Sequence, residues 1–120
     1  LRAGGDTELQ SRTYESAHPY ANSFDSGRTV VHMPGARALR LRFDMRCSME
    51  TNCDVLHIYA GRREGEYVRR ASCREGDRAW SSNFGPLEIP GNTMCFRFTS
   101  DATNNDWGYK FTVYAVTADD

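Results

Sequence analysis

Hydrophobic and charged residues alternate one by one over several short stretches of this chain. The clearest stretch covers residues 39–45, which read LRLRFDM. Side chains of a β-strand point in turn to opposite faces, so this pattern predicts a strand with one face on a core and the other in water. The same alternation predicts strands over residues 55–59, 94–98 and 109–114, and residues 29–33 form a further short candidate.

Turn-forming residues separate these stretches. Pro34-Gly35, Ala60-Gly61 and Pro90-Gly91-Asn92 each lie between two strand candidates and are typical of tight turns. No stretch keeps the three- and four-residue apolar spacing of an amphipathic helix over two turns, so helix should be a minor component. Several short strands at about ten-residue spacing predict an all-β, antiparallel β-sandwich.

The length and charge of the chain limit its organisation and its partners. The 120 residues suffice for one domain, and the formal net charge of −1 gives no electrostatic case for binding nucleic acid or an anionic membrane. Apolar runs of only a few residues predict no membrane insertion. We expect a monomeric sandwich over residues 12–116, with linker or terminus at residues 1–11 and 117–120.

Four cysteines, Cys47, Cys53, Cys73 and Cys95, allow two disulfides or four thiols. Five residues separate the first two, and no C-x2-C pair exists, which argues against a zinc site. Cys95 alternates with the strand's phenylalanines, so we expect it to face outward. An exposed free thiol there would favour a reducing compartment.

Two features could suggest chemistry but have simpler interpretations. The best catalytic set is Cys47 or Cys73 with His57 and Asp54, but no spacing supports it, so we expect no enzyme. The arginines that flank the turn after residue 61 predict a solvated rim, with an anion-binding role as the alternative. They are Arg62, Arg63, Arg69 and Arg70.

Three segments, in order, resemble the motifs of CUB domains. Residues 53–61 (CDVLHIYAG) are similar to the C-x-Y-D-x-L-x-I-Y-D-G strand of the family. Residues 98–103 (FTSDAT) resemble its F-x-S-D-x-S segment, and residues 16–22 resemble its opening S-P-x-Y-P-x-x-Y. The resemblance covers about residues 12–116. It implies a CUB-like jelly roll that binds proteins through its loops.

A closer resemblance is to CUB-like modules of very large intracellular proteins, such as giant ubiquitin ligases and zinc-finger and EF-hand-containing proteins. It rests on residues 15–20 (ESAHPY), 43–50 (FDMRCSME) and 107–113 (WGYKFTV). Secreted CUB domains have a cysteine between their first two strands, whereas none precedes Cys47 here. The resemblance implies a possible disulfide between Cys53 and Cys73 but leaves the other two cysteines unpaired. Reduced thiols and an intracellular location are favoured, with a secreted protein as the alternative.

Some CUB domains bind calcium at one edge, and the resemblance implies a ligand set here. Ca²⁺ takes six to eight oxygen ligands, several of them anionic. The strand and loop aspartates of the family correspond to Asp54 and Asp101, and Glu50 replaces the family's glutamate, whose position holds Arg46. The full candidate set is Glu50, Asp54, Asp101, Thr103, Asn104 and Asp106. The alternative is structural: Asp101 caps a turn and Asp54 pairs with an arginine.

The sequence thus predicts a non-catalytic protein-interaction module, with calcium-dependent binding as its more specific form. Trp107, Trp80 and Asn105 are the candidate contacts for a protein partner, since exposed tryptophans often contribute most to binding. The alternative is a structural spacer of a large multidomain protein, without a metal site.

Overall fold

A computed structural model of the chain describes residues 5–119. In chain order its elements are β1 (Gly5–Glu15), β2 (Thr29–His32), β3 (Ala38–Phe43), β4 (Val55–Ala60), β5 (Tyr67–Ala71), α1 (Trp80–Phe84), β6 (Leu87–Pro90), β7 (Thr93–Thr99) and β8 (Lys110–Asp119). Within these residues, no helix has the length and apolarity that a membrane span requires.

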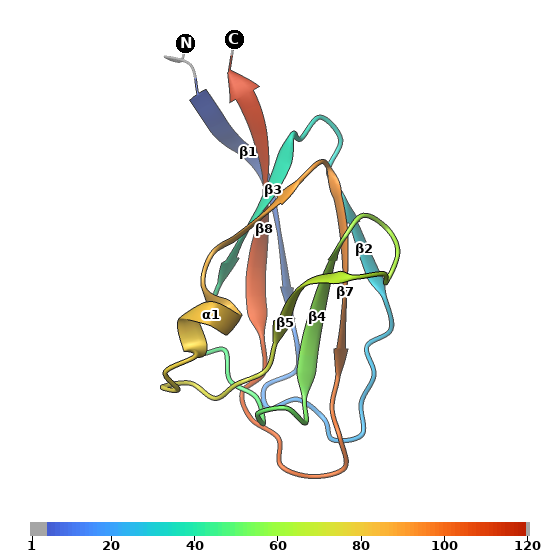
Figure 1. The fold of residues 1–120 in the computed structure, drawn as a ribbon, viewed down its shortest axis with the longest axis vertical. Helices are drawn as coiled ribbons and strands as arrows, with labels where there is room; N and C mark the ends of the chain where they lie inside the picture. The colour runs from blue at the N-terminus through green and yellow to red at the C-terminus, as the bar shows by residue number, and fades with distance from the viewer. Residues whose placement is uncertain (1–4, 120) are drawn as a thin grey trace.

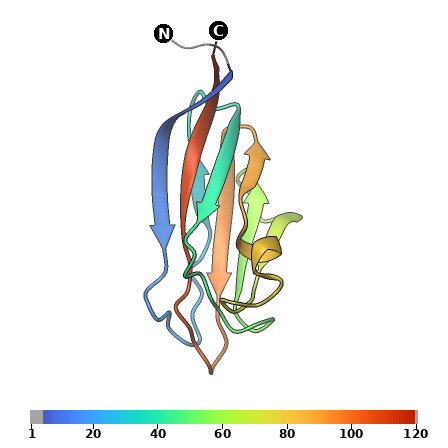
Figure 2. The same ribbon diagram turned by 90° about the vertical axis from the view of Figure 1, so that its left-hand side faces the viewer.

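The strands form two four-stranded antiparallel sheets that pack face to face (Figures 1 and 2). One sheet has the order β1-β8-β3-β6 and the other β2-β7-β4-β5. The predicted all-β sandwich is therefore confirmed.

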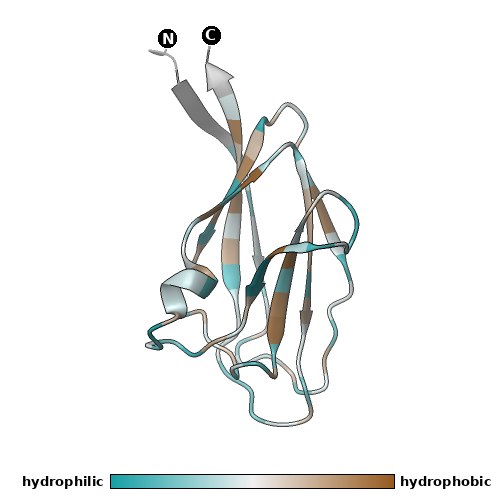
Figure 3. Cartoon of the chain, viewed as in Figure 1, coloured by the Kyte–Doolittle hydropathy of each residue, from teal (hydrophilic) through white to brown (hydrophobic). Residues whose placement is uncertain are grey.

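The strands that alternation predicted most clearly, β3, β4, β7 and β8, occupy the inner positions of the two sheets. In β3, the side chains of Leu39 and Leu41 are fully buried while Arg42 is exposed. Inner strands bury one whole face, so their sequences must alternate. The apolar bands that result are visible along these strands in Figure 3.

Aromatic side chains from several strands meet between the sheets. The ring centroids of Phe96 and Phe111 lie 5.0 Å apart in an edge-to-face arrangement, and those of Tyr20 and Phe98 have the same separation and geometry. Edge-to-face pairs of this kind add to the energy of apolar burial. The first pair links the two sheets, and the second packs the segment between β1 and β2 onto β7.

Three strands and the helix were not predicted individually. β1, β5 and β6 are all edge strands, and an edge strand with few buried positions has only weak alternation. The ladder between β1 and β8 runs from Gly5–Asp119 to Glu15–Lys110. Strand structure therefore extends beyond both expected limits of the sandwich, at residues 12 and 116, because the two segments pair with each other.

Cys95 faces outward from its sheet as predicted, but the prediction that its thiol is exposed was wrong. The thiol lies outside the core cluster, on the outer face of its sheet, as alternation requires, yet it is 0% exposed. Val30 and Tyr59 are its direct partners on the neighbouring strands. Opposite residues of antiparallel strands point to the same face, so these side chains flank and cover the thiol. Burial raises the pKa of Cys95.

Replacing Leu41 by alanine should lower the free energy of unfolding by about 2–5 kcal/mol, because it opens a cavity between the sheets. Met45→Ala is the control, since Met45 is 81% exposed and should change stability by less than about 0.5 kcal/mol. Urea unfolding monitored by fluorescence would measure both. Equal effects would contradict the assignment of the core.

Candidate functional site

Three loops meet at the end of the sandwich that is opposite the two chain ends (Figure 1). They are residues 16–28 between β1 and β2, residues 44–54 between β3 and β4, and residues 100–109 between β7 and β8. We call these loops the loop edge. All six predicted calcium ligands lie in the last two loops.

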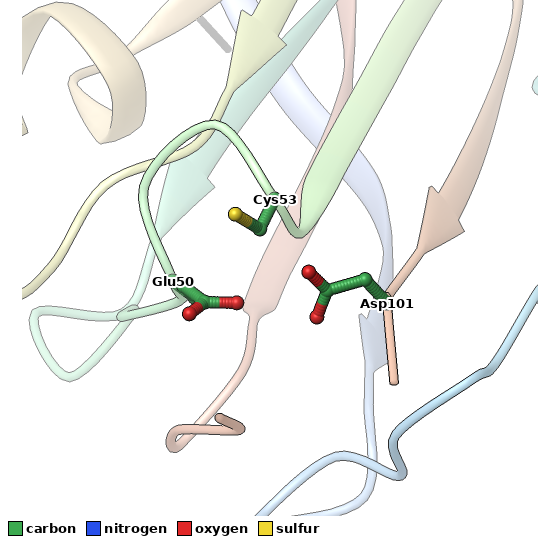
Figure 4. A group of neighbouring side chains, drawn as sticks. All are labelled: Glu50, Cys53 and Asp101. Carbon is green, nitrogen blue, oxygen red and sulfur yellow. The ribbon is translucent and has the colours of Figure 1, made fainter. Parts of the chain in front are cut away.

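Glu50, Cys53 and Asp101 form a cluster in which the potential ligand atoms lie within 4.8 Å of one another (Figure 4). We call it the acidic cluster. One oxygen of Glu50, Oε2, accepts a hydrogen bond from the Asn104 side chain at 2.9 Å. The other, Oε1, is buried and has no hydrogen-bond partner among the described residues. A buried carboxylate oxygen without a donor is costly, so this atom calls for a further contact.

Asp54 lies beside the acidic cluster, but its side chain faces the interior and is 0% exposed. The Tyr20 hydroxyl donates to its Oδ2, and the backbone N–H of Asp101 donates to its Oδ1 at 2.9 Å. The same hydroxyl accepts a hydrogen bond from the Glu50 N–H at 3.1 Å. Burial and the bond to Asp54 raise the pKa of Tyr20, so it remains a donor. The structural alternative had supposed that Asp54 pairs with an arginine, but no arginine among the described residues pairs with it.

Asp106 bonds to different residues from those that the other predicted calcium ligands contact. Its Oδ2 accepts hydrogen bonds from the Ser48 hydroxyl at 2.5 Å and from Arg74 at 2.6 Å, and its Oδ1 accepts one from the Trp107 N–H at 2.7 Å. Burial alone would raise the pKa of Asp106, but these donors outweigh it and lower the pKa. Both oxygens are engaged within the protein, which places Asp106 in a structural network rather than in the acidic cluster.

The remaining candidates lie in the exposed part of the loop that follows Asp101. The Thr103 N–H donates to Asp101 Oδ1 at 3.3 Å, which is the turn-capping bond of the structural alternative. Asn104 has a left-handed backbone, with φ of 63°, which asparagine tolerates better than most residues. Its amide nitrogen, rather than the expected oxygen, faces Glu50. Asn105 is exposed.

A second set of contacts holds the loops at a fixed separation. Ser48 and Gly108 exchange two backbone hydrogen bonds of 2.9 Å. Gly108 has φ of +105°, and a Cβ there would lie 2.0 Å from the Ser16 hydroxyl oxygen, so only glycine fits. Sequence reasoning assigned no role to Ser48 or Arg74. Nor did it indicate the bond between Tyr20 and Asp54, because only the fold brings these two residues together.

Both tryptophans that were predicted as partner contacts are partly buried and pack on the core. The Trp80 indole N–H donates to the Cys47 carbonyl at 2.8 Å, which fixes α1 to the loop before β4. The Trp107 ring stacks on His18 with centroids 3.8 Å apart, and the Arg46 guanidinium lies 4.7 Å from its centroid. These contacts give both rings structural roles, and their contact with a partner stays a prediction.

All four cysteines are free, so the structure has no disulfide between Cys53 and Cys73. Cys53 is exposed and belongs to the acidic cluster, whereas Cys73 is buried in the core. Loss of solvent and the nearby carboxylates of Glu50 and Asp101 raise the pKa of Cys53. Cys53 therefore stays a neutral thiol, a poor ligand for a hard cation.

Sequence relatives of this chain are segments of very large proteins. It is 38% identical over 112 residues to human "E3 ubiquitin-protein ligase HERC2", which is 93% of this chain and 2% of the ligase. It is 39% identical over 109 residues to human "Zinc finger ZZ-type and EF-hand domain-containing protein 1", which is 90% of this chain and 3% of that protein. No family model matches the chain.

Solved structures with the same fold are CUB domains. The human MASP-1/3 CUB1-EGF-CUB2 structure has a TM-score of 0.71 and 18% identity, and covers 92% of this chain and 42% of its own. The MASP-1 CUB2 domain bound to Ca²⁺ has a TM-score of 0.65 and 16% identity. The match covers 88% of this chain and 93% of that domain's chain. At these identities the likeness concerns the fold alone.

Tyr20→Phe should lower the free energy of unfolding by about 1–3 kcal/mol, because buried Asp54 loses its hydroxyl donor. Tyr67→Phe is the matched control, since the Tyr67 side chain is exposed and no described residue bonds its hydroxyl. Urea unfolding at pH 7 measures both. A Tyr20→Phe protein as stable as the control would show that this bond contributes little.

The ion pair of Arg74 and Asp106 should make stability depend on pH. The lowered pKa of Asp106 stabilises the fold above the ordinary carboxyl value of about 3.9, and this contribution is lost as pH falls through the lower folded value. Arg74→Met should therefore cost about 0.5–1 kcal/mol at pH 7, discounted for the pair's exposure.

The difference in free energy of unfolding between wild type and Arg74→Met should shrink as pH falls from about 4 through the lowered folded pKa of Asp106, because Asp106 then takes up a proton in the folded protein. Urea midpoints across this range would measure it. Arg12→Met removes an exposed arginine of β1 and should give a small difference that does not vary with pH. If the stability difference between wild type and Arg74→Met did not change with pH, the ion pair would not contribute to stability.

Proposed function

We propose that this chain, which is a CUB-like domain, acts as a protein-interaction module whose loop edge is ordered by calcium. The chain shares its fold with CUB domains, and its sequence offers no spacing that supports a catalytic set, so the proposed role is non-catalytic. The observation that supports the calcium site best is the acidic cluster, with the buried Glu50 Oε1 that lacks a donor.

The two carboxylates of the acidic cluster fit a hard cation. Glu50 and Asp101 supply carboxylate oxygens, the ligands that Ca²⁺ prefers. Among the salt bridges of the described residues, none involves either of them. Two neighbouring carboxylates without a cation repel each other, and a divalent ion would remove this repulsion and satisfy Oε1. Cys53 would remain outside the ligand set as a neutral thiol.

Asp54 has a different part in this proposal from the one the sequence suggested. Each of its oxygens already accepts one hydrogen bond, and each keeps a further lone pair. By accepting the Asp101 N–H, Asp54 fixes the backbone that carries the Asp101 carboxylate. Thr103 and Asn104 lie in the same loop and could supply further oxygens once a cation is bound.

A bound cation would join the loops at residues 44–54 and 100–109 and give a partner a rigid surface. Carboxylates that face the ion would keep outer oxygens for a basic side chain of the partner. Without a cation, the same surface would be a set of repelling carboxylates. Partner binding would therefore depend on calcium, because only the calcium-bound loops offer a rigid surface. A structural spacer would show no such dependence on calcium.

We also propose an intracellular location. The four free cysteines agree with a reducing compartment. The two relatives named above are a giant ubiquitin ligase and a zinc-finger and EF-hand-containing protein, the two kinds of large protein that the sequence motifs resemble. The activity of any larger protein that contains this domain would reside elsewhere.

Calcium should bind to the isolated domain and raise its melting temperature. When the free calcium concentration is ten times the dissociation constant, binding should add about 1.4 kcal/mol to the free energy of unfolding and raise the melting temperature by roughly 5 °C. Asp101→Asn keeps the size of the side chain but removes its charge, and should abolish both the heat of binding and the shift. Calorimetry and thermal unfolding with and without calcium would measure them.

Glu66→Gln is the control for this experiment, because it removes an exposed carboxylate on the far side of β4 from the loop edge. It should bind calcium as wild type does. Absence of heat and of a melting shift in the wild type at millimolar calcium would exclude the calcium-dependent form.

A further inference from the structure

We propose that the β4–β5 hairpin carries a second docking surface, which takes an extended acidic segment of a partner protein along the free edge of β5. This surface, called the hairpin edge below, consists of Arg62, Arg63, Tyr67, Val68 and Arg70. It does not depend on the calcium site. β4 begins at Val55, next to Asp54, and ends at Ala60, so the turn with Arg62 and Arg63 lies at its other end.

The backbone of β5 is open on one side. β5 is the last strand in the order β2-β7-β4-β5, and its ladder to β4 uses the other side. In Figure 1 it lies at the border of its sheet, with α1 beside its end. The described contacts with the α1 segment lie towards the end of the strand: the Arg69 side chain donates to the carbonyls of Asn83 and Gly85, and the N–H of Ser72 donates to the Asn83 side chain at 2.8 Å. A row of unpaired backbone groups is a template for an added strand.

Apolar surface lies next to this open edge. Tyr67 is 51% exposed and Val68 is 45% exposed, and they are two of the four exposed large hydrophobic residues of the described chain. The Tyr67 ring lies 5.5 Å from His57 on the outer face of the sheet. Tyrosine and arginine are enriched at protein interfaces, and the hairpin edge brings both kinds together.

The charge of the hairpin selects the occupant. Residues 55–71 contain four arginines and two glutamates, in a chain whose formal net charge is −1. One of the glutamates, Glu64, is bound to Arg97. Arg69 is turned inward, where it donates to the carbonyls of Asn83 and Gly85. The positive charge that stays outside is therefore that of the other three arginines.

These three arginines have no carboxylate partner among the described residues. Arg70 donates to the Asn52 amide oxygen at 3.2 Å, which leaves its charge uncompensated, and Arg62 and Arg63 are exposed. A segment rich in aspartate or glutamate would compensate all three. A second copy of this chain would bring arginine against arginine, so the charge disfavours self-pairing through the same edge.

Two of the other edges, those of β6 and β2, suit an added strand less well. β6 ends at Pro90, which has no N–H, and its Glu88 is bound to Arg40 at 2.9 Å. β2 has only four residues. β5 has a bulge at Val68, between the pairs Tyr59–Tyr67 and Ile58–Arg69. Bulges and charges also serve to block edge pairing, so the experiment must separate docking from protection.

A blocked octapeptide of alternating glutamate and valine is the probe, and the same peptide with lysine for glutamate is its counterpart. Binding would be followed by amide chemical shifts and hydrogen exchange of the isotope-labelled domain, without calcium. We expect the acidic peptide to shift and protect the amides of residues 67–71, and the basic peptide to leave them unchanged. Because calcium is absent, failure of the calcium site would not affect the result.

Arg63→Glu should weaken binding of the acidic peptide about three- to tenfold. Arg12→Glu makes the same charge change on β1, in the other sheet, and should leave binding unchanged. Tyr67→Thr, which keeps a strand-forming residue but removes the ring, should also weaken it. Sedimentation of the free domain should show a monomer.

Four outcomes would overturn the proposal. They are no protection of residues 67–71 by the acidic peptide, equal binding of the basic peptide, equal effects of Arg63→Glu and Arg12→Glu, and a dimer that forms through β5. The first would mean that the arginines and the bulge only protect the edge, and the last would make a second copy the occupant.

Discussion

The loop edge depends on one buried carboxylate. Asp54 is fully buried at the start of β4, where it accepts hydrogen bonds from the Tyr20 hydroxyl and from the Asp101 N–H. These donors come from the other two loops, so one side chain fixes all three loops to one another. A carboxyl group in this buried position is tolerated because both of its oxygens are bonded. Whatever binds at the acidic cluster binds to loops whose backbone Asp54 has already fixed.

The rest of the loop edge uses its charges in two different ways. Asp106 is neutralised by Arg74 and bonded by Ser48, so its negative charge is compensated within the protein. Glu50 and Asp101 have no such cation, and Glu50 Oε1 has no donor among the described residues. Acidic residues a few positions apart in sequence therefore have opposite characters, one set structural and the other available to a ligand.

The two proposed surfaces start from opposite ends of β4, and Arg70 of the hairpin edge reaches Asn52 of the loop edge. Asp54 precedes β4 and belongs to the loop edge, whereas the turn that follows β4 carries Arg62 and Arg63. The loop edge carries the acidic cluster, whereas the hairpin edge carries three arginines without a carboxylate partner among the described residues, a separation that a net charge of −1 for the whole chain conceals. A sandwich of two sheets can present both ends because its core lies between the sheets and leaves the loops and edges free.

The sequence by itself determined the sandwich and the positions of its inner strands. Leu39 and Leu41 lie on the face of β3 that is buried. Because that face must be apolar and the opposite face polar, the sequence of β3 alternates. The edge strands β1, β5 and β6 have weaker patterns because neighbours cover them on one side only. The family motifs also brought Glu50, Asp54 and Asp101 to attention, as residue types in a given order.

Only the tertiary structure decided what these residues do. Asp54 and Asp101 are 47 positions apart, and no sequence pattern could tell that the backbone N–H, rather than the carboxylate, of Asp101 meets Asp54. In the same way, Arg74 reaches Asp106, Cys53 faces Glu50 instead of Cys73, and Val30 and Tyr59 cover Cys95. Alternation gives the face on which a side chain lies, but its partners come from strands and loops that are distant in sequence and meet only in the folded chain.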